Sequence, residues 1–365
     1  MVEHYLFRPL DFLRARLLSH SLRVRPLRKI FDSRLLRSLS MVVASFALNF
    51  LLMLYLPLWT LLVVPGILGM GHFIGSLSTF HQTAAPLQYA HDPLTQRRTQ
   101  STLFYACGVF GILRLIGYSG QVPGVAQFSK FVQEYFRLID LVIVVSSFLC
   151  FLKIYRIPFL RKAPHLAGLL AYGLLMFLWP GLFWGLFIFS HNFTAFRFWH
   201  LHAPSPEEKT ACWISFGLFA MIHLLVLAGG LDSSIHTIPV DQSITQIFGY
   251  SFFQISWDLF PGLYDLSFSR KIVMLLCFGQ GVHYLLWIKV IPECRLNIHR
   301  PVPFSRSFRT LQQEWGRQRA LFAILLVIGF GIASVLLRVD RVNDVFFSIA
   351  FYHIYAEYIA LALKT

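Results

Sequence analysis

Long apolar stretches recur along the chain from residue 39 to its end, and they constrain the fold more than any other feature of the sequence. A helix needs about 20 apolar residues to cross the ~30 Å hydrocarbon core of a bilayer. Charged residues make up only 13% of the chain, against about 25% in soluble domains. We therefore expect an all-α, polytopic integral membrane helical bundle. Soluble globular, disordered and disulfide-rich secreted proteins are excluded.

Apolar stretches with the length of one span lie near 39–56, 59–80, 101–118, 134–153, 211–230, 271–290, 320–337 and 345–364. Residues 164–200 are too long for one span, because about 37 helical residues reach about 55 Å. The Pro180-Gly181 pair predicts that this region forms two short spans. Residues 244–263 are interrupted by polar side chains, which predicts a re-entrant or interfacial helix. The sum is about ten spans, within a range of about eight to eleven.

The formal charge of +15 lies mainly beside the apolar stretches, with nine Lys or Arg residues in positions 1–38. Basic loops next to spans face the cytoplasm and anionic headgroups. We therefore expect both termini in the cytoplasm, in the bacterial inner membrane, with membrane lipids as partners. The basic clusters are too short for a nucleic-acid-binding domain, so no nucleic acid is expected. The predicted organisation is a basic amphipathic segment, 1–38, followed by one transmembrane domain, 39–365, with a basic cytoplasmic loop at 291–319.

Five of the fourteen histidines lie near the centres of predicted spans: His72, His191, His223, His283 and His353. Measured from the span midpoints, they fall within about 5 Å of a common plane. Ionisable side chains at this depth are costly and normally face a partner inside the bundle. The shared depth therefore predicts a common site. His223 has the least polar surroundings, so a structural role is the first expectation for it.

The last predicted span adds a carboxylate, because His353 and Glu357 are four residues apart and share one helix face. Imidazole ligands suit Zn, Cu, Fe and Ni, and imidazole with carboxylate and open positions suits non-haem iron. Bundles assemble such sites from facing helices. We expect His72, His191, His283 and His353 as metal ligands and Glu357 as a ligand or proton relay. Additional or supporting residues are His81, His200, His202, His223, Asn192 and Gln280.

Histidine ligands at one membrane depth resemble, in kind, the membrane-embedded iron oxygenases that desaturate lipids or cleave carotenoids. The HxxxH and HxxHH boxes of the desaturases are absent from this chain. The leading hypothesis is a metalloenzyme, a non-haem iron oxidase or oxygenase of a lipid-soluble substrate. The redox or protein partner stays open.

Two alternatives remain from the sequence. A haem b protein would hold its cofactor between opposed histidines, and the glycines near His72 and His283 would permit the close approach of the macrocycle. A transporter of protons or metal ions would use the intramembrane histidines and Glu357 as a relay. The chain shows no inverted repeat, which weakens this second alternative.

Overall fold

The structure is a computed structural model that describes residues 7–21, 23–57, 60, 64, 68–89, 92–118, 126–232, 266–295, 303–336 and 339–364. No strand occurs in these ranges, and the all-α prediction is confirmed. The α-helices are α1 (Arg8–Ser21), α2 (Arg25–Asp32), α3 (Arg34–Tyr55), α5 (Met70–Ala84), α6 (Pro93–Tyr118), α7 (Ala126–Ile154), α8 (Phe159–Leu178), α9 (Pro180–His202), α10 (Pro206–Leu227), α14 (Leu266–Leu285), α15 (Ile291–Arg295), α16 (Phe304–Trp315), α17 (Arg317–Leu336) and α18 (Val339–Lys364). A 3-10 turn (Leu87–Tyr89) and a π-helical segment, η4 (Leu286–Val290), complete the described elements.

Within the described residues, four helical stretches are long and apolar enough to cross a membrane: Arg34–Tyr55, Glu134–Ile154, Pro206–Leu227 and Arg270–Arg295. Large apolar side chains point outward from the helices, as Tyr105 (70% exposed) and Leu224 (67% exposed) do. Outward apolar side chains suit contact with lipid. The described helices overlap every predicted span, with α5 covering residues 70–80 of the span 59–80, but the count of ten stays a prediction. The helix predicted at 244–263 lies outside the described residues.

Helix breaks follow from local chemistry. The chain leaves α8 at Leu178 and begins α9 at Pro180, where the missing N–H of proline costs nothing. The long apolar stretch 164–200 is therefore divided at the Pro180-Gly181 pair. Ser33 and Ser205 cap α3 and α10, because each hydroxyl accepts a hydrogen bond from a backbone N–H in the first turn.

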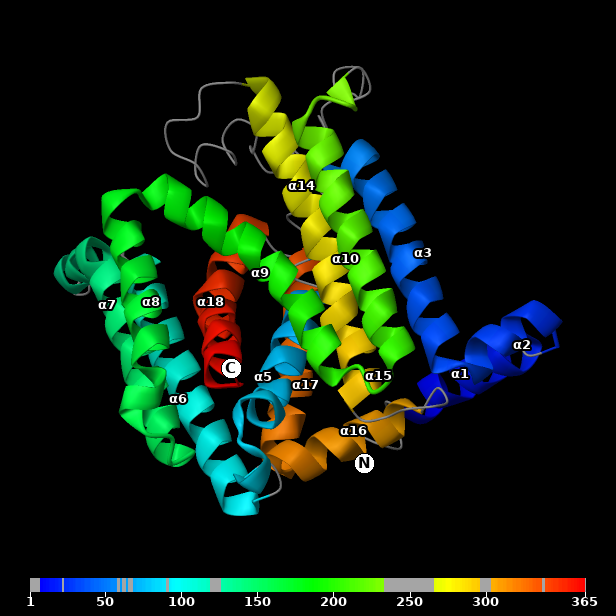
Figure 1. The fold of residues 1–365 in the computed structure, drawn as a ribbon, viewed down its shortest axis with the longest axis horizontal. Helices are drawn as coiled ribbons and strands as arrows, with labels where there is room; N and C mark the ends of the chain where they lie inside the picture. The colour runs from blue at the N-terminus through cyan, green and yellow to red at the C-terminus, as the bar shows by residue number, and fades with distance from the viewer. Residues whose placement is uncertain are drawn as a thin grey trace.

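Figure 1 shows how the helices surround α18. Helices α3, α10 and α14 stand side by side on one side of the molecule, and α6, α7 and α8 stand on the other. Helix α18 lies between these two sets and packs closely on α5 and α6, while α9 crosses from α8 to α10. His353 and Glu357 of α18 are therefore enclosed by neighbouring helices.

Two glycines let α14 approach its neighbours. A Cβ atom at Gly281 would lie 1.7 Å from Asn49 Oδ1 of α3, and one at Gly279 would lie 2.6 Å from Asn192 Nδ2 of α9. A larger residue at either position would force the contacting Asn side chain or helix α14 to shift, so the two glycines permit this close approach. This close packing places His283, which follows on α14, next to α5 and α9.

The N-terminal helix α1 packs against α16. The Phe7 and Phe308 rings lie 5.0 Å apart. Asp11 Oδ1 accepts a hydrogen bond of 2.6 Å from the backbone N–H of Phe304, at the start of α16. The N-terminal segment is thereby fixed to the predicted cytoplasmic loop. The division into a segment 1–38 and a domain 39–365 stays a prediction.

Candidate metal centre

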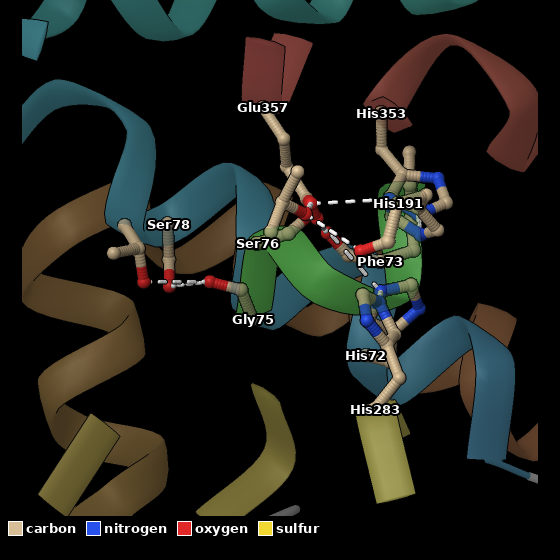
Figure 2. Close-up of polar contacts among 11 residues, drawn as sticks. His72, Phe73, Gly75, Ser76, Ser78, His191, His283, His353 and Glu357 are labelled. Atoms are coloured by element: carbon tan, nitrogen blue, oxygen red, sulfur yellow. Dashed lines mark hydrogen bonds and ion pairs between the residues drawn. The ribbon is translucent and has the colours of Figure 1, made fainter. Parts of the chain in front are cut away.

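Five side chains from four helices meet inside the bundle. His72 comes from α5, His191 from α9, His283 from α14, and His353 and Glu357 from α18. Figure 2 shows their side chains directed toward one another. One ligand atom from each lies within 4.8 Å of all the others, and none of the five residues is more than 7% exposed. We call this group the histidine cluster.

The nitrogen atoms of the histidine cluster have the spacing of ligands around a single ion. His72 Nε2 lies 2.8 Å from His283 Nε2, and His191 Nε2 lies 3.2 Å from His353 Nε2. Metal–nitrogen bonds of about 2.0–2.1 Å place two ligands of one ion roughly 3–3.4 Å apart. The imidazoles therefore need only small adjustments to bind a common metal ion.

The two carboxylate oxygen atoms of Glu357 have different contacts. Oε2 lies 3.2 Å from His191 Nδ1 and accepts a hydrogen bond of 2.8 Å from the Thr194 hydroxyl. Oε1 lies 3.9 Å from His72 Nε2 and has no hydrogen-bond partner among the described residues. A buried carboxylate oxygen without a partner is costly. Oε1 is therefore the oxygen suited to a fifth metal ligand, while Oε2 orients His191.

The charge of the histidine cluster is incomplete as built. In the part of the chain that the structure describes, the ion-pair partners of Glu357 are His72 and His191, and no Lys or Arg is paired with it. Neutral imidazoles that face one another through Nε2 bring acceptor lone pairs together unless a proton or a cation lies between them. A bound cation would satisfy both the lone pairs and the carboxylate.

Aromatic side chains enclose the histidine cluster. The Tyr284 ring lies 5.1 Å from the His72 ring, and the Trp287 ring lies 6.3 Å from the rings of both His72 and His283. Trp287 belongs to η4, the π-helical segment that begins three residues after His283. Single π-helical turns occur often at functional sites. The surroundings are therefore dry and apolar on this side, which strengthens the electrostatic interactions of any bound ion.

The structure separates the other predicted site residues from the ligand set. His223 contacts the backbone oxygen of Phe219 through Nδ1 at 2.9 Å and packs on the Phe219 ring at 4.4 Å. It lies outside the histidine cluster, so this arrangement fits the structural role first expected for it.

The remaining supporting candidates also lie outside the histidine cluster. His81 Nδ1 lies 3.3 Å from the Tyr155 hydroxyl, His202 Nε2 lies 2.9 Å from the Thr83 hydroxyl, and the His200 ring packs 5.4 Å from Trp213. These three are not members of the histidine cluster. Asn192 packs against Gly279, and Gln280 interacts with Tyr284, the tyrosine beside His72. Asn192 and Gln280 therefore border the cluster without belonging to it.

Thr194 is the residue that the sequence reasoning missed. It is buried, and its hydroxyl contacts both Glu357 Oε2 (2.8 Å) and the backbone oxygen of His191 (2.7 Å). Its signal was its spacing, because a residue three positions after His191 lies on the same helix face. The sequence alone does not mark Thr194 as a site residue, because threonines are common in membrane helices.

No family model, curated protein or solved structure matches this chain. The assignment of the site therefore rests on its geometry. Five buried His and Glu side chains, brought together from distant parts of the sequence, form a group that could hold a metal ion.

Proposed function

We propose that the protein is a membrane-embedded metalloenzyme, a non-haem iron oxidase or oxygenase that acts on a lipid-soluble substrate. The observation that carries the proposal is the histidine cluster itself, whose five ligand atoms lie within 4.8 Å of one another inside the bundle. His72, His191, His283 and His353 would hold the ion through nitrogen, and Glu357 through Oε1. The mixed imidazole and carboxylate set suits iron among the transition metals.

The chain's own residues fit this chemistry in three ways. The Thr194 hydroxyl holds Glu357 Oε2 beside the His191 ring, where Oε2 would support a metal-bound His191. Burial of the cluster excludes bulk water, and the neighbouring aromatic rings suit an apolar substrate. When bound, an iron ion would supply Lewis acidity and redox chemistry toward oxygen.

The same geometry favours a single ion over haem b. Two axial haem ligands stand on opposite faces of a macrocycle, about 4 Å apart with the iron between them. Here the two nitrogen pairs lie closer, at 2.8 and 3.2 Å, and all five groups converge on one point. The gaps left by Gly279 and Gly281 are occupied by Asn192 and Asn49. These glycines support helix packing instead of a haem slot.

The ligand set also favours an enzyme over a transporter of protons or metal ions. Transport needs a site that releases its ion readily, whereas five buried donors that share one ion would release it slowly. The proposal includes the predicted placement: about ten spans, both termini in the cytoplasm, and the bacterial inner membrane. The apolar stretches and the four membrane-length helices support a membrane protein in general.

The test is oxygen consumption by protein reconstituted with Fe(II) in lipids extracted from the expression host. We expect steady oxygen uptake that tracks the iron content, and a visible spectrum without a Soret band. The matched control is His353→Ala, which removes one ligand from α18 and should abolish uptake. A Soret band, or uptake that is unchanged in His353→Ala, would contradict the proposal. Iron bound by the wild-type protein without oxygen uptake would reject the oxygenase and leave only a metal-binding protein.

A further inference from the structure

A second buried polar group lies on the other side of α18, at a cavity of about 710 Å³ lined by residues of α6, α7 and α8. Its lining includes Arg114, Glu134, Arg137 and Asp140, together with the aromatic side chain of Phe177. Glu134 begins the membrane-length stretch of α7, and Phe177 is the penultimate residue of α8. The cavity therefore lies where these helices meet a membrane surface, at the level of lipid headgroups.

The inner wall of the cavity is an ion pair. Arg114 donates a hydrogen bond to Asp140 Oδ2, and its guanidinium group lies 4.3 Å from the centre of the Phe136 ring. Tyr355 of α18 is close enough to interact with both charges. The position of the pair is therefore fixed by aromatic packing and by the helix that also carries His353 and Glu357.

One carboxylate oxygen of the Arg114–Asp140 ion pair receives no hydrogen bond from the described residues. Asp140 is 1% exposed, and its Oδ1 atom has no hydrogen-bond partner among the described residues although Asp140 lines the cavity. A buried carboxylate oxygen without a donor is costly. The cavity thus lacks a hydrogen-bond donor at a defined point, and a ligand with N–H groups would supply it.

The charges at the mouth define that ligand further. Exposed Glu134 and Arg137 lie on the cavity wall, so the wall offers both a carboxylate and a guanidinium beyond the Arg114–Asp140 pair. A wall with both signs suits a zwitterion: an ammonium for the carboxylates and a phosphate for the free guanidinium. The volume is within the range of small-molecule sites, about 300–1,000 Å³.

We propose that this cavity binds the headgroup of a phospholipid that carries a primary ammonium, of the phosphatidylethanolamine type. The ammonium would donate to Asp140 Oδ1 and Glu134, the phosphate would accept from Arg137, and the acyl chains would lie along the apolar outer faces of α7 and α8. The proposal does not rest on the metal, because no ligand of the histidine cluster lines the cavity.

The test is native mass spectrometry of delipidated protein titrated with phosphatidylethanolamine, and separately with phosphatidylcholine of the same acyl chains. Phosphatidylcholine has both charges but no N–H donor, so we expect it to bind about tenfold more weakly, as one charge-assisted hydrogen bond predicts. Equal binding of the two lipids would overturn the proposal. Equally tight binding of free phosphoethanolamine would show a soluble ligand and would also overturn the lipid assignment.

Two variants of α7 localise the binding. Leu138 lines the cavity and is 48% exposed, whereas Val142, one turn later, is 55% exposed and does not line it. We expect Leu138→Trp to weaken phosphatidylethanolamine binding about tenfold by filling the mouth, and Val142→Trp to leave it unchanged. Arg137→Gln should weaken binding without filling space, which covers the case in which Leu138→Trp fails to fold. Identical binding by Leu138→Trp and Val142→Trp, or unchanged binding by Arg137→Gln, would place the lipid elsewhere.

Discussion

Two groups of buried ionisable side chains in the described part of the protein balance their charge in different ways. Near the ends of α3, α10 and α15, each buried or partly buried carboxylate faces an Arg or Lys. We call these residues the ion-pair group; its contacts are Arg34–Glu208 (2.6 Å), Arg37–Glu293 (3.0 Å), Lys289–Glu293 (2.6 Å) and Arg295–Glu314 (3.1 Å). Each carboxylate of the ion-pair group has its counter-charge within the protein.

The histidine cluster has a different composition. It brings together four imidazoles and one carboxylate, and among the described residues the ion-pair partners of that carboxylate are histidines alone. Buried charges are tolerated when they are paired or bind a metal. In the ion-pair group the counter-charges come from the protein's own Arg and Lys residues, whereas the histidine cluster has the donor set that could bind a cation.

The largest effect on stability should come from breaking the ion-pair group. Glu293→Ala removes the partner of both Arg37 and Lys289. Because buried Arg37 loses the carboxylate that faces it, we expect a loss of about 3–5 kcal/mol in unfolding free energy. Thermal unfolding in detergent measures it. Asp32→Ala is the control, since its ion pair with Arg28 is exposed and worth less than about 1 kcal/mol. Equal losses in the two variants would contradict the comparison.

Removal of the metal should lower the melting temperature only in proteins whose histidine cluster is intact. A ligand present at roughly 100 times its Kd stabilises the folded state by about 2.7 kcal/mol. We therefore expect a chelator to lower the melting temperature of the wild-type protein and to leave that of His353→Ala unchanged. Glu293→Ala should respond to the chelator as the wild type does. A chelator effect of equal size in His353→Ala would show that the metal binds elsewhere.

Helix packing around the histidine cluster should respond to one added methyl group. Gly281→Ala would place a Cβ atom 1.7 Å from Asn49 Oδ1, so the Asn49 side chain, which is hydrogen-bonded to Ser45, or helix α14 itself must shift. We expect a loss of about 1–3 kcal/mol in stability and weaker metal binding, because His283 shifts with α14. Gly217→Ala on α10 is the matched control, since no atom lies within 4 Å of its added Cβ. Gly217→Ala should preserve the melting temperature, and a larger loss there than in Gly281→Ala would refute the packing argument.

The smallest predicted effect belongs to the carboxylate of the cluster. Glu357→Gln keeps the shape and the contact with Thr194 but loses the negative charge. We expect metal binding about tenfold weaker, about 1.4 kcal/mol, measured by competition with a chromogenic chelator. Thr194→Val should weaken metal binding less than Glu357→Gln does. Unchanged affinity in Glu357→Gln would remove Oε1 from the ligand set.

The sequence predicted the fold class and the depth of the polar residues because both depend on the number of apolar residues along the chain. Counting from span midpoints placed His72, His191, His283 and His353 at one level, and the structure brings these four together. His223 shows the limit of that reasoning. Its predicted depth is similar, but it contacts the backbone of Phe219 instead of the other histidines.

The sequence alone does not show which face of each helix points into the bundle. A helix that is apolar on every face gives no periodic pattern that marks its inner side. The close packing at Gly281 depends on Asn49, a residue more than 200 positions earlier in the chain. The hydrogen bond from Thr194 to Glu357 likewise joins two helices that are far apart in the sequence, α9 and α18. Such pairs appear only when the helices are assembled.

The most direct test of the central claim is the metal content of purified protein by inductively coupled plasma mass spectrometry. The account predicts about one transition-metal ion per chain, with iron favoured. His72→Ala, His191→Ala, His283→Ala and His353→Ala should each lose the ion while staying folded, and His165→Ala and His223→Ala should keep it. Wild-type protein without stoichiometric metal after growth and reconstitution with iron, zinc, copper and nickel salts would contradict the account. Equal metal content in the wild type and the four cluster variants would contradict it as well.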